Sequence, residues 1–197
     1  MKDMNKIKNL VVNIDMVYGF CVEGALADPY IKRTIPFQKQ RLEKAQKEED
    51  TAIVFINDCH SDDSVEFEFF PPHCKKGTIE CKIVDELEDY SKDALTFEKN
   101  STSGMTDEFT NFLGLIKKCP NLDKVEIQGC CTDLCIMNFA IPLRNYFNEH
   151  NMHTDVVIYE ETVETFDAPN HKREEYNEWA FKFMKQNGIK IKKLGVR

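Results

Sequence analysis

The sequence predicts a single α/β domain in which helices cover both faces of a six-stranded, mostly parallel, doubly wound sheet. Short apolar runs rich in Val, Ile and Phe alternate along the chain with longer segments of helical periodicity, and this alternation is typical of right-handed βαβ units. The apolar runs are nearly continuous, as expected for strands buried on both faces. At 197 residues with an apolar fraction of 42%, the whole chain (1–197) can form one domain with a sizeable core.

Six strands and four helices are expected from this pattern. The strands are the apolar runs at residues 9–14, 52–56, 94–97, 124–127, 155–159 and 189–194. The helices cover residues 35–49, 107–118, 133–150 and 169–184. The second helix carries an apolar stripe after a Thr106 cap, and Gly188 suits the end of the last helix.

The charge and the hydropathy of the chain exclude several classes of partner. A formal net charge of −8 argues against nucleic acids and anionic membranes, since both require a cationic face. The first apolar stretch, residues 10–14, is too short for a signal peptide and contains Asn13, and no run approaches the ~20 apolar residues of a membrane span. A cytoplasmic location is expected, where the eight cysteines should be thiols because disulfides are rare.

Reactive side chains follow four of the expected strands. Asp15 follows the first strand, Asp58 and His60 the second, Lys99 the third, and Cys135 the fourth. The carboxyl ends of parallel strands lie at one edge of the sheet, which is where ligands bind in doubly wound folds. Each of these residues alone could be an ordinary loop residue, but together they predict an active site.

Cys135 is the candidate nucleophile. It falls in the first turn of a helix, where free N–H groups and the positive end of the dipole favour a thiolate and can bind an oxyanion. Asp15 could take the thiol proton and pass it to a leaving amine. Lys99 between the two anions would keep Asp15 ionised and favour the thiolate. On position alone, a buried structural cysteine and a structural ion pair between Asp15 and Lys99 remain alternatives.

A metal site is expected beside these residues. Asp58 and His60 form a D-x-H pair, and residues i and i+2 of an extended chain point the same way. His73 and Glu66 could complete the set of ligands. Two histidines and two carboxylates suit a divalent ion, with zinc as the first choice and iron or manganese as alternatives.

Other polar clusters are weaker candidates for catalysis or metal binding. The Cys-His pairs at 59–60 and 73–74 could form a structural zinc site, but adjacent residues of an extended chain do not converge on one ion. The acidic runs 85–89 and 160–164 are expected to be solvated faces. The remaining histidines are expected on the surface, namely His150, His153 and His171.

Three motifs resemble the cysteine hydrolase superfamily of nicotinamidases and isochorismatase-like enzymes, and the resemblance runs from about residue 10 to about residue 168. IDMVYGF (14–20) is similar to the family's strand-end aspartate followed by D-F or G-F. FPPHCKKGT (70–78) is close to the W/F-P-x-H-C-x-x-G-T of the metal-binding nicotinamidase branch. GCCTDLCI (129–136) matches the family's G-x-x-T-D-x-C-V.

The resemblance implies the isochorismatase-like hydrolase fold and hydrolysis of nicotinamide to nicotinate and ammonia through a cysteine thioester, in NAD salvage. It also implies a cis Cys130–Cys131 peptide bond, which proteins retain where function requires it. Relatives are often dimers or tetramers, so a homo-oligomer is compatible with it. The implied roles are a triad (Asp15, Lys99, Cys135), an oxyanion hole (N–H of Cys131 and Cys135), metal ligands (Asp58, His60, His73, with Glu66 as a fourth) and a substrate pocket (Phe20, Phe70, Cys131).

Two departures from the family pattern keep other functions open. NSTSGM (100–105) follows Lys99 where relatives often carry an aromatic residue, which weakens the case for nicotinamide in particular. Glu80 and Cys81 stand where G-A is common after G-T. The alternatives are a relative that acts on another small amide, ureido or carbamoyl compound, a non-catalytic binding or regulatory domain on the same scaffold, and a redox sensor.

Overall fold

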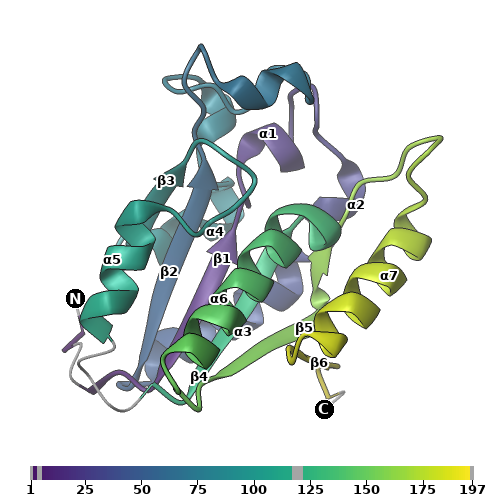
Figure 1. Cartoon of the computed structure of the whole chain (residues 1–197). Coiled ribbons are helices and arrows are strands. Elements are labelled where there is room, and N and C mark those ends of the chain that lie inside the picture. Colours follow the sequence, from purple (N-terminus) through teal and green to yellow (C-terminus); the bar gives the residue numbers. More distant parts are fainter. Residues whose placement is uncertain (1, 4–5, 117–121, 196–197) are drawn as a thin grey trace.

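A computed structural model describes residues 2–3, 6–116 and 122–195 of the chain. Six strands form a sheet in the order β3-β2-β1-β4-β5-β6, and all neighbouring strands run parallel (Figure 1). The fold class is therefore confirmed, and the sheet is entirely parallel. The strands are β1 (Asn9–Ile14), β2 (Thr51–Asp58), β3 (Leu95–Lys99), β4 (Lys124–Cys130), β5 (Asp155–Glu164) and β6 (Lys190–Lys192).

Helices cover both faces of the sheet because successive strand residues point to opposite sides. In β1, Leu10 and Val12 belong to one hydrophobic core, and Val11 belongs to the other. The first core packs against α5 (Asp107–Ile116), α6 (Met137–Glu149) and α7 (Arg173–Gln186), which lie on one side of the sheet in Figure 1. The second core packs against α1 (Tyr18–Cys21), α2 (Pro29–Lys32), α3 (Ile35–Lys47) and α4 (Asp85–Ser91).

Among the residues that the structure describes in full, three short helical turns complete the elements, and two of them carry predicted site residues. They are the 3₁₀ turns η2 (Val65–Glu68) and η3 (Ile79–Cys81) and a π-helical turn, η4 (Thr132–Ile136), that precedes α6. No helix among residues 2–3, 6–116 and 122–195 is long and apolar enough to span a bilayer.

The helix boundaries differ from the sequence prediction in places. The last helix, α7, begins at Arg173 instead of residue 169, because Ala168 and His171 exchange two backbone hydrogen bonds (2.9 and 3.0 Å) that hold the preceding segment in a turn. Gly188 adopts φ +84° after α7, as predicted for that helix end. The helix expected over 107–118 is described to Ile116, and residues 117–118 lie outside the described residues.

The acidic run 160–164 is not the solvated face that we expected. It forms the second half of β5, which continues beyond a register shift and pairs Val163 with Gly129. Thr162 and Val163 are buried in this half. The Glu164 carboxylate accepts a hydrogen bond from the Asn177 side chain at 2.5 Å. The other acidic run, 85–89, forms the exposed side of α4, with Leu87 as its buried residue.

Candidate active site

The predicted residues converge at the carboxyl edge of the sheet. Asp15 follows β1, Asp58 ends β2, Lys99 ends β3, and Cys135 lies in the π-helical turn η4 after β4. All four side chains are buried. The prediction from the strand ends therefore holds for their placement in space.

Lys99 lies at the centre of this group. Its Nζ is 2.9 Å from Asp15 Oδ2 and 3.8 Å from Cys135 Sγ, and it also contacts Asp58 Oδ1. Burial by itself lowers the pKa of Lys99, but the two carboxylates outweigh burial and raise it well above its ordinary value. The lysine is therefore a buried ammonium ion shared by two carboxylates.

The backbone of Asp15 adopts an uncommon conformation, and hydrogen bonds hold the residue in place. Its backbone has φ 55°, which is uncommon for a residue with a side chain, and its N–H donates to the carbonyl of Ile56 at 3.0 Å. Its carboxylate accepts a hydrogen bond from the backbone N–H of Asp58 (2.7 Å), and one carboxylate oxygen lies within 4.8 Å of the Cys135 sulfur. Burial and the nearby Asp58 charge raise the pKa of Asp15 to about 6, against the opposing effect of Lys99. The group suits a proton acceptor and donor near neutral pH.

The Cys135 thiol differs in one respect from the sequence prediction. We expected the start of a helix and Lys99 to favour a thiolate. Burial dominates instead and raises the pKa of Cys135 well above its ordinary value, with Lys99 acting in the opposite direction. The resting group is therefore a thiol, and its proton must be removed when it reacts. An Asp15 carboxylate oxygen lies within 4.8 Å of the sulfur, so Asp15 is placed to remove the proton.

Gly129 explains why the nucleophile turn can lie so close to Asp15. It has φ +126°, and a Cβ atom at this position would lie 1.9 Å from the carbonyl oxygen of Ile14. Only glycine allows this approach of β4 to the end of β1. The Cys130–Cys131 peptide bond that follows is cis, as the resemblance implied. The carbonyl of Cys131 then accepts hydrogen bonds from the backbone N–H groups of Leu134 and Ile136, both at 3.1 Å.

Asp58, His60 and His73 form a buried group that could hold a metal ion, since their ligand atoms all lie within 4.8 Å of one another. His60 Nε2 is 3.4 Å from Asp58 Oδ1, and His73 Nε2 is 3.6 Å from Asp58 Oδ2. Although burial raises the pKa of Asp58, the Lys99 ammonium and the two histidines outweigh this effect and hold that pKa well below its ordinary value. An ionised carboxylate and two imidazoles suit a divalent ion.

The outer nitrogens of both imidazoles support this assignment. His60 Nδ1 faces the Asn100 side-chain oxygen at 3.3 Å, and His73 Nδ1 faces the Pro71 carbonyl at 2.9 Å. Protons on these nitrogens leave both Nε2 atoms free to act as ligands. Among the described residues, the buried His60 Nε2 has no hydrogen-bond partner, as expected of a nitrogen whose partner is an ion.

Glu66 lies at the rim of this group rather than inside it. One carboxylate oxygen accepts hydrogen bonds from the backbone N–H (2.8 Å) and the hydroxyl of Thr102, while the other faces His60 Nε2 at 3.5 Å. The alternative zinc site with Cys59 and Cys74 is wrong. In the described part of the chain, neither group of side chains that could hold an ion includes either cysteine, and Cys59 faces a different pocket together with Cys81.

A pocket with about 470 Å³ of free space, its open mouth included, joins the two groups of residues. The three predicted pocket residues, Phe20, Phe70 and Cys131, all line it. The sequence argument missed Phe166 because it ended β5 at residue 159, whereas Phe166 follows the true end of that strand. Thr102 also lines the pocket and belongs to the segment after Lys99 that departs from the family pattern, whereas Leu26 and Leu134 line it without a sequence signal that we can identify.

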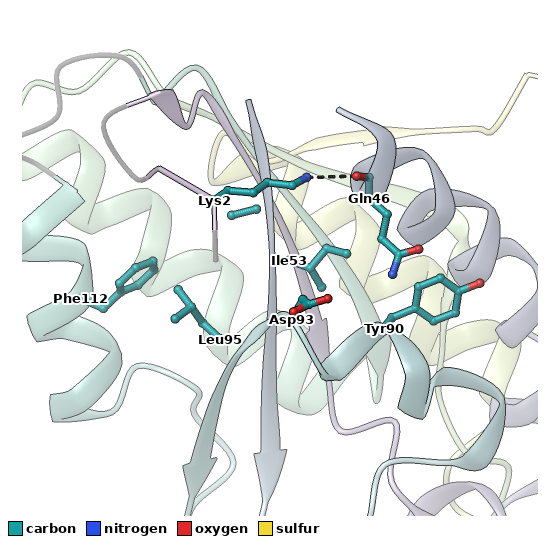
Figure 2. A pocket seen from close by; sticks show the side chains of 8 residues that line it. Lys2, Gln46, Ile53, Tyr90, Asp93, Leu95 and Phe112 are labelled. Atoms are coloured by element: carbon teal, nitrogen blue, oxygen red, sulfur yellow. Dashed lines mark hydrogen bonds between the residues drawn. The ribbon is translucent and has the colours of Figure 1, made fainter. Parts of the chain in front are cut away.

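A second pocket lies at the opposite edge of the sheet (Figure 2), where Ala52 and Leu95 mark the beginnings of β2 and β3. Lys2 crosses it and donates hydrogen bonds to carbonyls at the end of α3, including Ala45 at 2.7 Å. The residues that line it include none of the predicted catalytic or metal-binding residues. The predicted catalytic and metal-binding residues therefore lie at the carboxyl edge, away from this pocket.

His171 is not the surface residue that we expected. Its Nε2 lies 2.8 Å from Asp133 Oδ2, and its ring is stacked on Phe166. The ring is consequently half-buried beside the pocket. His153 is exposed as predicted, and His150 is half-buried with its Nδ1 2.8 Å from the carbonyl of Tyr146.

Several solved structures share this fold. The pyrazinamidase/nicotinamidase of Streptococcus mutans superimposes with a TM-score of 0.77 at 21% identity, over 93% of this chain and 99% of that one. The pyrazinamidase of Pyrococcus horikoshii in complex with zinc gives 0.76 at 23%, over 95% and 99%. The N-carbamoylsarcosine amidase of Thermoplasma acidophilum gives 0.74 at 23%, over 95% and 96%. No curated protein matches the sequence.

The match to a family model covers most of the chain. The isochorismatase domain model matches residues 9–191, from the first residue of β1 into β6. This range includes every residue of the candidate active site and both faces of the sheet. The chain therefore belongs to the isochorismatase family of hydrolases.

Proposed function

We propose that this hydrolase is a cysteine amidase that converts nicotinamide to nicotinate and ammonia, with Cys135 as nucleophile, Asp15 as proton carrier and Lys99 as the cation between them. The observation that carries the proposal is a buried ammonium ion, Lys99, that lies 3.8 Å from the Cys135 sulfur and 2.9 Å from an Asp15 carboxylate oxygen. This group opens into the same pocket as Asp58 and His73. We expect the reaction in the cytoplasm, where it would supply NAD salvage.

The first half of the reaction forms a thioester. Cys135 Sγ attacks the carboxamide carbon while its proton passes to Asp15, whose carboxylate lies within 4.8 Å of the sulfur. The negative charge that develops on the amide oxygen would be stabilised by the backbone N–H groups of Cys131 and Cys135. When the C–N bond breaks, Asp15 returns the proton to the nitrogen, and ammonia leaves.

The second half regenerates the enzyme. Asp15 takes a proton from a water molecule, whose oxygen attacks the thioester carbon. The C–S bond then breaks, the proton returns to Cys135, and nicotinate is released. Lys99 remains an ammonium ion throughout and balances the charge of Asp15 and Asp58 as the proton moves.

The proposal includes a divalent metal ion, with zinc as the first choice. Asp58, His60 and His73 would hold it, and Glu66 is placed to act as a fourth ligand or through a water molecule. When bound, the ion would supply a Lewis-acidic contact for a ring nitrogen of the substrate and so position the carboxamide. The structure of the Pyrococcus relative in complex with zinc supports this choice of ion.

One observation favours a second candidate substrate class. Thr102, from the segment that departs from the family pattern, places a hydroxyl-bearing side chain in the pocket where relatives often carry an aromatic ring. The Thr102 hydroxyl donates its proton to Glu66, so its oxygen could accept a hydrogen bond from an N–H group of a small ureido or carbamoyl compound. An N-carbamoylsarcosine amidase is among the similar structures. The same Cys135 chemistry would apply to its C–N bond.

Ammonia release by the purified protein tests the proposal. Nicotinamide should release ammonia at a rate that Cys135→Ala abolishes and that Cys81→Ala, which removes a thiol outside the pocket, leaves unchanged. A full rate in Cys135→Ala would refute the mechanism. Release of ammonia only from ureido or carbamoyl compounds would keep the mechanism and replace the substrate.

A further inference from the structure

Phe166 lies in the segment between β5 and α7, and its side chain faces the pocket. It lines the pocket that contains Cys135, and it follows Thr165, whose side chain is fully buried. A phenylalanine in a connecting segment would ordinarily be free to turn about its side-chain bonds, and ordering such a side chain on binding weakens affinity. The contacts behind Phe166 therefore determine whether it presents a fixed surface.

His171 supplies those contacts. The two rings are stacked with their centroids 3.8 Å apart and an angle of 12° between their planes. On its other side, His171 is stacked on Tyr176 of α7, with a centroid distance of 3.7 Å and an angle of 27°. His171 Nδ1 also lies 3.1 Å from the backbone carbonyl of Phe166. Phe166 is thus backed by a row of rings that ends on a helix.

The same histidine is tied to the nucleophile turn. Asp133, two residues before Cys135, places Oδ2 2.8 Å from His171 Nε2 and accepts a hydrogen bond from the Thr165 hydroxyl on Oδ1 at 2.5 Å. Asp133 is buried, so these contacts are sheltered from water. The position of Phe166 is consequently fixed relative to the turn that carries the nucleophile.

We propose that His171 is a positioning residue that holds Phe166 as a flat, rigid wall of the pocket, and that this wall makes the site prefer planar aromatic amides to aliphatic ones. The inference deepens the proposed function and rests on it, since it assumes that amides react at Cys135. Aromatic rings gain from offset stacking on a ring that is already held in place, whereas an aliphatic amide has no planar ring to stack. The effect should therefore appear in substrate binding and depend on the ring of the substrate.

Steady-state kinetics on two His171 variants tests this role. His171→Gln keeps a donor for Asp133 but removes the ring, and it should raise KM for nicotinamide about tenfold with kcat within about threefold. His171→Phe keeps the ring but loses the polar contacts, and it should restore KM to within about threefold of the wild-type value. For a small aliphatic amide such as propionamide, both variants should match the wild type. A fall in kcat without a change in KM, or an equal change for both amides, would overturn the proposal.

A third variant provides an independent test if His171→Phe does not fold. Tyr176→Leu removes the outer ring of the stack without touching Asp133, and it should raise KM for nicotinamide about threefold while KM for propionamide stays constant. Melting temperatures of all variants should be measured first, so that kinetics are compared only among folded proteins. An unchanged KM for nicotinamide in folded Tyr176→Leu would count against the row of rings.

Alkylation of Cys135 separates this proposal from the choice of substrate. Iodoacetamide is a small aliphatic reagent and N-phenylmaleimide carries a planar phenyl ring, and mass spectrometry of the Cys135 peptide gives both rates. His171→Gln should slow the aromatic reagent about tenfold relative to iodoacetamide, and His171→Phe should not. If the rates shift in this way in a protein that hydrolyses no amide, the role of His171 in holding Phe166 is supported and the proposed function is wrong. If the protein hydrolyses nicotinamide but neither the alkylation rates nor KM shift, the role of His171 is wrong and the proposed function is supported.

Discussion

The backbone N–H of Asp58 donates a hydrogen bond to Oδ1 of Asp15 at 2.7 Å. The residue at the centre of the predicted metal group therefore also orients the predicted base. Lys99 makes a second link, because its ammonium contacts the carboxylates of both residues. The metal group and the catalytic group are thus neighbours that share a hydrogen bond and a cation.

Metal binding should depend on the buried histidines. The wild-type protein should contain about one divalent ion per chain by elemental analysis, and His60→Ala or His73→Ala should contain almost none. His153→Ala is the matched control, since His153 is exposed and distant in sequence from this group. At a free-ion concentration 100 times Kd, the ion should add about 2.7 kcal/mol to the free energy of unfolding. A chelator should therefore lower the melting temperature of the wild type but not of His60→Ala.

Glu66→Gln tests the predicted fourth ligand. The change keeps the shape of the side chain and a hydrogen-bond acceptor for Thr102, but it removes the charge that faces His60. Metal affinity, measured by competition with a chelator of known affinity, should fall about 10- to 100-fold. Glu68→Gln on the same 3₁₀ turn is exposed and should leave the affinity unchanged. Equal affinities for both variants would remove Glu66 from the set of ligands.

Lys99→Met should be strongly destabilising because it leaves two buried carboxylates without their shared cation. We expect the free energy of unfolding, measured in urea, to fall by about 3–5 kcal/mol. Lys76→Met is the control, since Lys76 and Glu98 form an exposed pair, and removing that pair should leave the free energy of unfolding almost unchanged.

The double variant checks the cause of that loss. Asp15→Asn removes one of the two charges that Lys99 balances, so Asp15→Asn with Lys99→Met should lose less stability than the sum of the single variants. Strict additivity would show that the contact between the two side chains contributes nothing to the stability of the fold.

Gly129→Ala should disrupt the approach of β4 to Asp15. A Cβ atom would lie 1.9 Å from the Ile14 carbonyl oxygen, and φ +126° is unfavourable for alanine. The free energy of unfolding should fall by at least about 3 kcal/mol. In contrast, Gly114 lies within α5 with open space around it, so Gly114→Ala should raise stability by about 0.5–1 kcal/mol. Comparable effects of the two changes would contradict this account of Gly129.

The sequence could predict the sheet because the information for a parallel strand is local. The run from Asn9 to Ile14 has few polar residues and follows a charged segment, and it is buried almost throughout. The prediction of β5 stopped early because Glu160 and Glu161 interrupt its apolar run, although pairing with β4 continues the strand to Glu164. The short helix α4 escaped prediction because Leu87 is its only buried residue.

The sequence by itself determined which residues meet at the site, because the carboxyl ends of parallel strands lie at one edge wherever such a sheet forms. Only the tertiary structure decided how these residues act. Burial outweighs the helix start at Cys135 and keeps it a thiol, and Lys99 contacts Asp58 as well as Asp15. His171 became part of the site through contacts with residues up to 38 positions away. Desolvation and such contacts depend on the atoms that surround a group in space, which no local pattern in the chain specifies.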